Sequence, residues 1–414
     1  MAEVQHHAKI VYISHWFPLS SETFVFYEVE WFYNKGFDIS VVSLYGRRDK
    51  ELSRRFLHCP VPVERLGIFA VARVFAAVLL SIFRNPGKTL EVIKDILFRR
   101  WRDWEQQLEN TWAGLCGIYL SRRFQEQGVE HIHAAWANGP ATAAWVASRL
   151  SGIPFSFSCH AGDIYPPDGA LAEKARASAF ARTIATNNIL HLDTFEPEAK
   201  DKHHLIYAIR TVPNESRRAE VRMVEPLRLL CIGRLVEMKG FRYAVEAVRE
   251  LKDRGIQSRL DIAGSGFCER QLKKLAAKLG IQESVHFHTF VTHDRIPDFL
   301  CASDIMLMPC IVLSGTGKSD GLPTVIIEGM TYGLPIISTN VAGIGDVIKH
   351  GETGLLVPQH DAVALADAVI SLLRDRENAL RMAEAAQKLV QVLFDSERNM
   401  LNLAALFDKH ALNG

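Results

Sequence analysis

The chain has 414 residues, of which 48% are hydrophobic and 23% are charged, and its formal net charge at pH 7 is +1. This length favours two or three domains over one, and each can bury a core of its own. Because charges of both signs are interspersed, the composition gives no electrostatic support for nucleic acid as a partner.

The cysteine content and the apolar stretches indicate a cytosolic protein. Seven cysteines, an odd number, form no C-x-x-C pair, so we expect them to be reduced core residues. The N-terminal sequence lacks the apolar region of a signal peptide. The longest apolar stretch, residues 69–83, has 15 residues and contains Arg73, whereas a membrane-spanning helix needs about 20. We therefore expect no helix that crosses a membrane.

In chain order, short β-branched runs alternate with helical patterns almost throughout. The runs are "KIVYIS", "FDISVVSLY", "HIHAAW", "PFSFSCH" and "RTIAT" in the first half, and "LRLLCIG", "RLDIAG", "VHFHTF", "IMLMP" and "PIIST" in the second. Such alternation predicts parallel sheets covered by helices. We therefore predict an α/β protein with two Rossmann-like parallel-sheet domains facing each other across a cleft, with ligands beyond the carboxyl ends of the strands.

The boundary between the two series of strands lies in a polar stretch. Residues 209–227 contain two prolines and lack apolar periodicity, which is typical of a linker. We divide the chain into an N-terminal domain of residues 1–210, a linker of residues 211–226 and a C-terminal domain of residues 227–392. The last helical pattern, residues 393–414, is expected to return to the N-terminal domain.

The loop after the first predicted strand contains Ser20, Ser21 and Glu22 and lacks a G-x-G-x-x-G motif. The missing motif argues against a dinucleotide-binding dehydrogenase. The three polar residues are typical of a loop and a helix start, where a simple N-cap is one interpretation.

Residues 47–123 carry 15 basic and 8 acidic side chains, a local net charge of +7. The helical part of this segment, residues 64–112, interleaves its basic residues with aromatic ones. Two interpretations stay open. The helices could lie on an anionic bilayer, or they could pack on the sheet with a solvated basic face.

Three histidines lie on or at the end of predicted strands. His131 and His133 alternate on one strand, and no third ligand stands at a useful spacing, so we predict no metal site. His160 ends another strand, at the edge where a parallel sheet binds its ligand, and Asp163 follows it.

In the second half, Pro323 suits the first turn of a helix and Gly333 the position after its end, so residues 323–333 predict a helix. Its free backbone amides, together with the positive end of the helix dipole, make a phosphate site. Glu328 lies among apolar residues, where a carboxylate is costly unless it accepts hydrogen bonds, and a ribose diol would supply two. Asp320 lies at most roughly 12 Å away, comparable to the distance from a ribose to a sugar across a diphosphate. Alternatively, Asp320 caps the helix and Glu328 forms a buried salt bridge.

Upstream, Arg234 and Lys239 follow a strand and could neutralise charge on one phosphate leaving group. Two solvated loop cations are the alternative. Gly264 and Gly266 would let the backbone approach a phosphate or sugar closely, although a plain tight turn explains them too. "GTGKSD" imitates a P-loop ending, but the first required glycine is missing, so we reject a Walker site.

The combination of "GRLVEMKG", "AGSG" and the acidic-x7-Glu element in "DGLPTVIIEGM" resembles the family 4 retaining glycosyltransferases of the GT-B fold. The resemblance covers nearly the whole second half. It implies that Arg234 and Lys239 bind the donor diphosphate, Glu328 holds the ribose and Asp320 contacts the donor hexose. Many members have Glu where this chain has Asp320, and "DGLP" resembles exopolysaccharide and colanic-acid-type transferases. The expected donor-binding residues are Arg234, Lys239, Gly264, Gly266, Asp320, Gly321, Leu322, Pro323, Thr324, Val325 and Glu328.

Residues 131–165 also resemble the exopolysaccharide subgroup. The resemblance implies that His160 lies against the donor sugar and that Asp163 orients it or contacts the acceptor. The loop with Ser20, Ser21 and Glu22 stands where many members have a Gly-rich loop that touches the donor phosphate or the acceptor. The expected catalytic residues are His160, Asp320, Arg234 and Lys239.

The resemblance implies a retaining transferase that moves a hexose from a UDP- or GDP-sugar to an acceptor, with no metal and no further cofactor. We expect the acceptor to be a lipid-linked saccharide in exopolysaccharide or other cell-surface polysaccharide synthesis. We expect a cytoplasmic protein bound peripherally to the anionic inner face of the cell membrane. Two other classes stay open: a sugar-nucleotide epimerase of the same architecture, which would turn over the donor alone, and a non-catalytic nucleotide-sugar-binding membrane scaffold.

Overall fold

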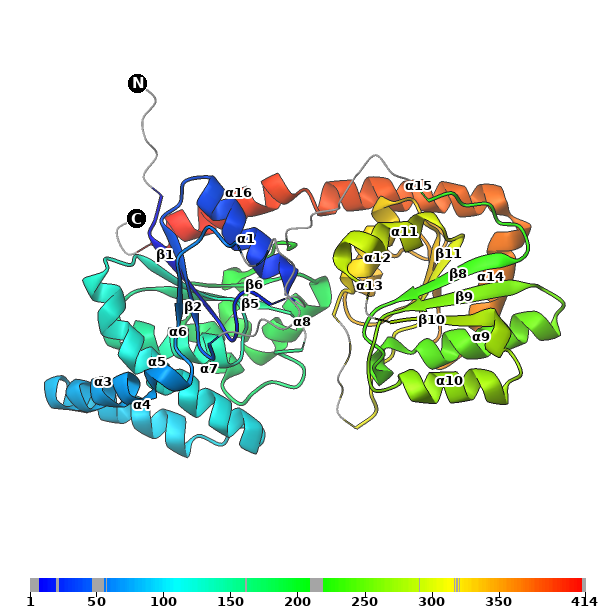
Figure 1. Cartoon of the computed structure of the whole chain (residues 1–414). Coiled ribbons are helices and arrows are strands. Elements are labelled where there is room, and N and C mark those ends of the chain that lie inside the picture. Colours follow the sequence, from blue (N-terminus) through cyan, green and yellow to red (C-terminus); the bar gives the residue numbers. More distant parts are fainter. Residues whose placement is uncertain are drawn as a thin grey trace, which may run out of the picture. The chain divides into compact units, whose positions relative to one another are not determined.

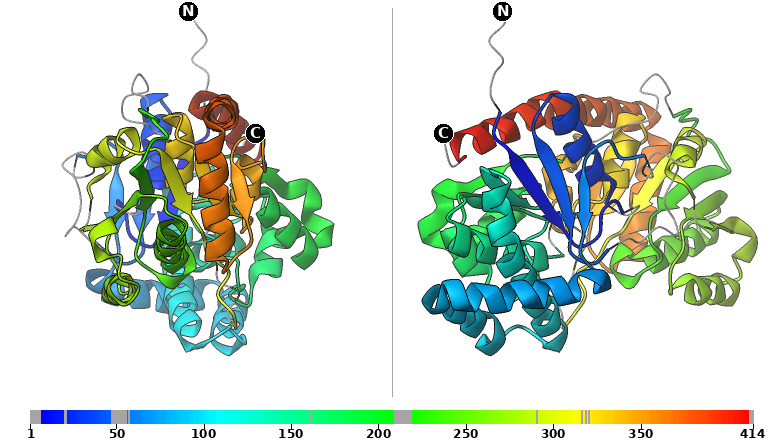
Figure 2. Two further views of the ribbon diagram at one scale, coloured as in Figure 1. Left: turned by 90° about the vertical axis from the view of Figure 1, so that its right-hand side faces the viewer. Right: turned by 60° about the vertical axis from the view of Figure 1, so that its left-hand side comes forward.

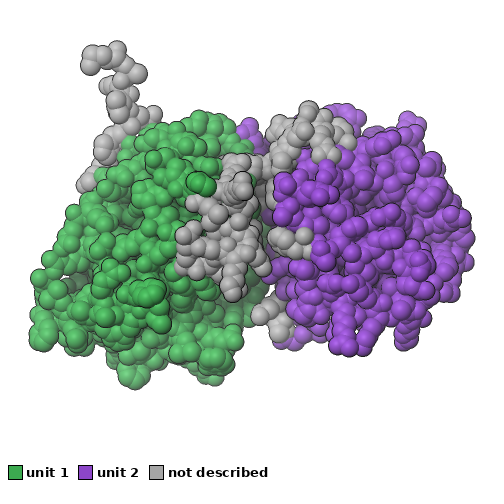
Figure 3. Space-filling view, in the orientation of Figure 1, with its two compact units in different colours: residues 1–210, 396–414 green, residues 211–395 purple. Residues whose placement is uncertain are grey.

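The computed structural model describes residues 7–19, 22–46, 56, 58–160, 162–208, 219–289, 291–315, 317, 319 and 321–411. The chain divides into two compact units (Figure 3). Unit 1 comprises Met1–Arg210 and Ser396–Gly414, and unit 2 comprises Thr211–Asp395. Residues 211–218 of the predicted linker, together with Ser20, Ser21 and Asp320, lie outside the described residues.

Unit 1 is built on a seven-stranded parallel sheet with the order β3-β2-β1-β4-β5-β6-β7 (Figure 1). Its strands are β1 (Ile10–Ser14), β2 (Ile39–Ser43), β3 (Val63–Arg65), β4 (His131–Ala134), β5 (Phe155–Cys159), β6 (Phe180–Thr183) and β7 (His203–Leu205). Its helices are α1 (Thr23–Asn34), α3 (Val71–Arg84), α4 (Pro86–Phe98), α5 (Trp104–Glu126), α6 (Gly139–Ser151), α7 (Leu171–Ala177), α8 (Thr186–Phe195) and α16 (Ser396–Lys409).

The sheet of unit 1 buries both of its faces. Along β1, Val11 and Ile13 point into a core that α5 and α6 cover, whereas Ile10 and Tyr12 point into a core that α1 and α16 cover. This alternation follows from the two-residue period of a strand. Phe407 of α16 is fully buried in the second core, so the last helix of the chain packs in unit 1.

Unit 2 is built on a six-stranded parallel sheet with the order β10-β9-β8-β11-β12-β13. Its strands are β8 (Leu227–Ile232), β9 (Ser258–Ala263), β10 (Val285–His288), β11 (Ile305–Met308), β12 (Ile336–Thr339) and β13 (Leu355–Val357). Its helices are α9 (Phe241–Asp253), α10 (Glu269–Lys278), α11 (Ile296–Cys301), α12 (Thr324–Thr331), α13 (Ile344–Val347), α14 (Ala362–Arg374) and α15 (Arg376–Leu393). The two predicted Rossmann-like parallel sheets are therefore confirmed.

Each sheet has one point at which the strand order changes direction. It lies between β1 and β4 in unit 1 and between β8 and β11 in unit 2. Parallel α/β sheets bind their ligands outside the carboxyl ends of the strands at this point, because the two neighbouring loops turn away from each other. The fold thus directs attention to the loops after these four strands. Among the described helices, none is long and apolar enough to cross a membrane.

Candidate active site

The loop after β8 carries both predicted diphosphate-binding cations, in different environments. Lys239 is 7% exposed, and its side chain lies along Gly233, where an added Cβ would come within 3.2 Å of its Cε. Arg234 is exposed and forms no ion pair with another described residue. The structure therefore offers one ammonium held in a fixed place and one guanidinium that can reorient toward an anion.

The loop after β9 packs directly on the loop after β8. Leu235 N–H donates to the Ser265 carbonyl at 2.8 Å. A Cβ on Gly264 would collide with the carbonyl oxygen of Gly233, and one on Gly266 with that of Leu235. Gly264 and Gly266 thus permit a close backbone contact, and the backbone that contacts them is the loop after β8 of the same unit. The structure gives the two glycines a packing role and leaves their predicted approach to a phosphate a hypothesis.

The predicted helix around residues 323–333 is α12, and its ends match the expected signals. Pro323 occupies the N-cap position, and Gly333 follows the helix with a φ of 73°. The segment leading to α12 is tied to the loop after β8, because Ile311 N–H donates to the Met238 carbonyl at 2.9 Å. Gly321, just before α12, accepts a 3.2 Å hydrogen bond from Gly343 N–H in the loop after β12.

The amino-terminal end of α12 therefore lies at the same edge of the sheet as Arg234 and Lys239. Leu322, Pro323 and Val325 are buried, and Thr324 is exposed. Glu328 is 8% exposed in the middle of the helix, as expected from its apolar neighbours. Its predicted counterpart, Asp320, is outside the described residues.

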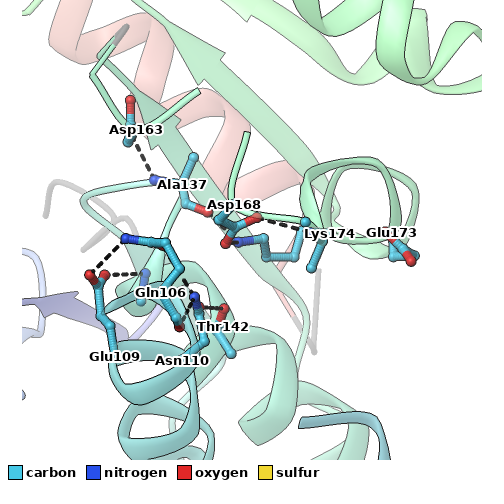
Figure 4. Close-up of polar contacts among 12 residues, drawn as sticks. Gln106, Glu109, Asn110, Ala137, Thr142, Asp163, Asp168, Glu173 and Lys174 are labelled. Atoms are coloured by element: carbon cyan, nitrogen blue, oxygen red, sulfur yellow. Dashed lines mark hydrogen bonds and ion pairs between the residues drawn. The ribbon is translucent and has the colours of Figure 1, made fainter. Parts of the chain in front are cut away.

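In unit 1, the loop after β4 is held by four polar side chains (Figure 4). Asp163 accepts from Ala137 N–H at 2.7 Å, and Lys174 donates to the Ala137 carbonyl. Glu109 accepts from Gly139 N–H at 3.0 Å, and His160 Nε2 donates to the Ala135 carbonyl at 3.2 Å. Hydrogen bonds thus hold both the N–H and the carbonyl of Ala137 at the carboxyl end of a central strand, and we call residues 135–138 the clamped loop.

His160 is half-buried, and its ring lies 4.6 Å centre to centre from each of Phe24 and Trp136, which also contact each other at 6.0 Å. Its backbone N–H donates to Asp163 Oδ1 at 2.8 Å. Of the two roles expected for Asp163, the structure thus supports orientation, although through the backbone of His160. Asp163 is nearly fully buried, and this burial raises its pKa to about 6 although it accepts backbone hydrogen bonds.

Glu22 occupies the N-cap position of α1, which begins at Thr23, but its side chain does not cap the helix. Its carboxylate instead accepts from Trp136 Nε1 at 3.1 Å, and burial raises its pKa. Glu22 therefore supports the aromatic residue that contacts His160.

A known family matches the part of the chain that carries the Arg234, Lys239 and α12 arrangement. The family model described as "Glycosyl transferases group 1" matches residues 212–389. Unit 2 is a group 1 glycosyltransferase domain. The family resemblance expected from the motifs is confirmed.

The likeness to known proteins extends beyond unit 2. An amylovoran biosynthesis glycosyltransferase of Erwinia amylovora is 25% identical over 97% of this chain and 100% of that protein. A putative colanic acid biosynthesis glycosyltransferase of Escherichia coli is 30% identical over 44% of this chain and 45% of that protein. Among solved structures, HepE of Anabaena in complex with UDP is 15% identical to this chain and has a TM-score of 0.72. The alignment covers 96% of this chain and 98% of the HepE chain. The predicted GT-B fold class is confirmed.

Sequence reasoning missed one pair in unit 1. His15 follows β1, and its Nε2 lies 2.9 Å from Glu109 Oε1, on α5. Burial alone would raise the pKa of Glu109, but the hydrogen bond and charge of His15, with the N–H of Gly139, hold it below its usual value. His15 stands directly after a predicted strand, which is a usable signal. Nothing in the sequence links it to Glu109, 94 positions away.

The buried ion pair of Lys174 with Asp168 was also missed. Lys174 is fully buried and Asp168 is 2% exposed, so both charges are satisfied inside the unit.

The strand histidines have a different role from the site histidines. His131 and His133 hydrogen-bond to Ser156 at 2.7 and 2.8 Å, and burial lowers the pKa of both.

Proposed function

We propose that this protein is a retaining hexosyltransferase that moves a hexose from a UDP- or GDP-sugar to a lipid-linked saccharide. The product belongs to exopolysaccharide or another cell-surface polysaccharide. One observation carries the donor assignment: Arg234, the buried Lys239 and the amino-terminal end of α12 share one sheet edge of unit 2. These are the groups that a diphosphate requires.

The names of similar proteins support the proposed substrates. One relative is an amylovoran biosynthesis glycosyltransferase, and another is a GDP-mannose-dependent mannosyltransferase acting on a phosphatidylinositol monomannoside in Mycobacterium tuberculosis. HepE of Anabaena, which shares the fold, binds UDP-glucose. A lipid-linked acceptor stays in the membrane, so we also propose peripheral binding to the anionic inner face of the cell membrane.

In the proposed mechanism, the bond between the anomeric carbon and the donor phosphate breaks as the acceptor hydroxyl attacks from the same face. Arg234, Lys239 and the free amides of α12 stabilise the negative charge that develops on the departing diphosphate. A diphosphate oxygen accepts the proton of the attacking hydroxyl, so no side chain acts as a nucleophile. Glu328 holds the ribose, and His160 and Asp320 position the hexose. The reaction requires no metal ion.

A thermal-shift panel of UDP- and GDP-hexoses tests the donor site directly. A ligand at a hundredfold excess over its Kd stabilises the folded protein by about 2.7 kcal/mol, which raises Tm by about 5–11 °C in a unit of this size. We expect one nucleotide class to give this shift and Arg234→Ala, Lys239→Ala and Glu328→Ala to remove it. Arg249→Ala is the matched control, because Arg249 is a partly exposed α9 cation paired with Asp253. The donor assignment is wrong if no sugar nucleotide raises Tm.

Product analysis then separates transfer from the other two classes. Incubation with the donor alone yields no epimerised sugar nucleotide if the protein is a transferase, and addition of a lipid-linked acceptor yields a glycosylated lipid with the anomeric configuration of the donor. Activity unchanged in EDTA is expected for a metal-free mechanism. An epimerised donor, or an inverted product, would contradict the proposal.

A further inference from the structure

Exposed apolar side chains concentrate on one part of unit 1. Among the described residues, the segment 68–108 holds 11 of the 22 large hydrophobic side chains that are exposed. The most exposed are Phe69, at 91%, Phe83, at 85%, and Phe98, at 81%. Soluble monomers rarely expose contiguous apolar patches of large size without a binding role. We define the α3–α4 surface by Ile68, Phe69, Phe75, Leu79, Leu80, Phe83, Leu90, Leu97 and Phe98.

Helix α3 is apolar on two opposite faces. Val74 and Val78 are its buried residues, and they pack toward α5. Helices α3 and α4 lie next to each other beside α5 (Figures 1 and 2). Phe75, Leu79 and Phe83 recur every four residues on the far side of the helix. Packing within unit 1 therefore accounts for one apolar face and leaves the other in contact with solvent.

The charges around this surface are separated by sign. Both acidic residues of α4 are paired with Arg149 of α6, the exposed Glu91 at 2.8 Å and the half-buried Asp95 at 2.6 Å. Five nearby cations are exposed and form no ion pair with any residue in the described part of the chain: Arg73, Arg84, Lys88, Lys94 and Arg100. The outward charge of the surface is consequently positive, which complements an anionic partner.

The same region is joined to the loops of the acceptor side. Just after α4, Arg102 N–H donates to the Asp168 carbonyl at 2.9 Å. Asp168 pairs with Lys174, which in turn holds the carbonyl of Ala137 in the clamped loop. A partner bound to the α3–α4 surface would thus sit next to the elements that frame His160.

We propose that the α3–α4 surface docks on an anionic lipid bilayer, with its phenylalanines and leucines at the boundary of the acyl chains and its cations at the headgroups. Both components match an interfacial helix, which combines an apolar face with basic residues and lies in the plane of the membrane. Membrane docking itself is argued from the α3–α4 surface alone. The purpose of docking, which is to bring a lipid-linked acceptor to unit 1, rests on the proposed function. Under this proposal both interpretations of residues 64–112 hold, because one face of α3 packs within unit 1 and the other face binds the bilayer.

Vesicle co-flotation with the full chain tests the proposal. We expect wild-type protein to float with vesicles that contain phosphatidylglycerol and to bind phosphatidylcholine vesicles at least tenfold more weakly, because each cation near an anionic surface strengthens binding about fivefold. The triple variant Phe69→Ser, Phe83→Ser, Phe98→Ser and, separately, Arg84→Glu with Lys88→Glu should each reduce binding by tenfold or more. The matched control replaces two exposed leucines elsewhere in unit 1, Leu190→Ser with Leu401→Ser, and should bind as wild type does.

Two results would overturn the proposal: wild-type protein that does not bind the anionic vesicles, or a triple variant that binds them unchanged. A wild-type dimer that the triple variant converts to monomer, without vesicle binding, would assign the surface to a second copy instead. The sugar-nucleotide thermal shift of the triple variant separates this inference from the proposed function. It should equal that of the wild type, since the altered residues lie in unit 1 and the donor groups lie in unit 2.

Discussion

Asp163 fixes the position of His160 by accepting a 2.8 Å hydrogen bond from its backbone N–H. The second carboxylate oxygen accepts from Ala137 N–H at 2.7 Å, so one buried side chain ties the carboxyl ends of β4 and β5 together. If His160 contacts the donor sugar as proposed, Asp163 acts as its positioning residue, and a change at Asp163 would reach the reaction through His160.

Replacing Asp163 should change the pH dependence of stability. The folded-state pKa of about 6 lies above the ordinary value of 3.8, so the contribution of this group to stability is present below about pH 4 and is lost as the pH rises through 6. We expect the difference in Tm between wild type and Asp163→Asn to fall between pH 4 and 6 and to stay constant above pH 7. A difference that is independent of pH over this range would contradict the assignment.

The buried pair of Lys174 and Asp168 should be costly to break and cheaper to replace. Lys174→Met leaves the carboxylate of Asp168 buried without its partner, and we expect a loss of about 3–5 kcal/mol in the free energy of unfolding. Lys174→Met with Asp168→Leu should recover part of that loss, because no buried charge remains. Urea denaturation measures both.

Arg122→Met is the control for the buried pair, because Arg122 pairs with Glu126 on the exposed face of α5. Its effect should stay within about 0.5 kcal/mol. Equal losses in Lys174→Met and in the double variant would mean that the ion pair itself matters less than the hydrogen bond to Ala137.

The glycines after β9 should be irreplaceable for a reason of packing. Gly264→Ala places a methyl group against the carbonyl of Gly233 and must displace the loop that carries Arg234 and Lys239. We expect Gly264→Ala to destabilise unit 2 by more than about 2 kcal/mol and to weaken sugar-nucleotide binding. Gly255→Ala is the matched control, with a positive φ of 78° and no neighbouring atom within 4 Å, so it should cost only about 1 kcal/mol. Similar losses in the two variants would show that backbone strain alone is responsible.

The contact between His15 and Glu109 should stabilise unit 1 at neutral pH. The pKa of Glu109 is lowered, so its stabilising contribution is present above its unfolded pKa and is lost as the pH falls through the lower folded value. We expect Glu109→Gln to lower Tm at pH 7 and to have less effect below pH 4. The thermal shift induced by UDP or GDP without a sugar should stay unchanged, because Glu109 and the groups proposed to bind the diphosphate and ribose are in different units. A loss of UDP or GDP binding in this variant would contradict that separation.

Much of the fold could be predicted from local patterns. Short β-branched runs predicted ten of the strands that the two sheets contain, whereas the short strands β3, β7 and β13 were not predicted. Pro323 with Gly333 predicted α12 almost to the residue. These signals are local because each depends on the conformational preferences of a few neighbouring residues. The motifs also led to the correct family.

The contacts that shape the candidate site could not be predicted in the same way. The partners of Ala137 and Gly139 come from α5, α7 and the loop after β5, and only the fold brings these segments together. The glycines after β9 were expected to face a ligand, but the obstacle beside them is the backbone of another loop. The segment 64–112 left two interpretations because its sequence cannot say which apolar face of α3 is covered.

Unit 1 is assembled from both ends of the chain, and this has a consequence for synthesis. A ribosome has made the whole of unit 2 before Phe407 becomes available to cover β1 and β4, so unit 1 is completed only after unit 2 has been translated. We expect a chain truncated after Asp395 to leave aromatic residues of the sheet uncovered and to be degraded or to aggregate in cells. Supplying the final 19 residues as a separate peptide should restore solubility, since the docking face of α16 is already formed by the remainder of the unit.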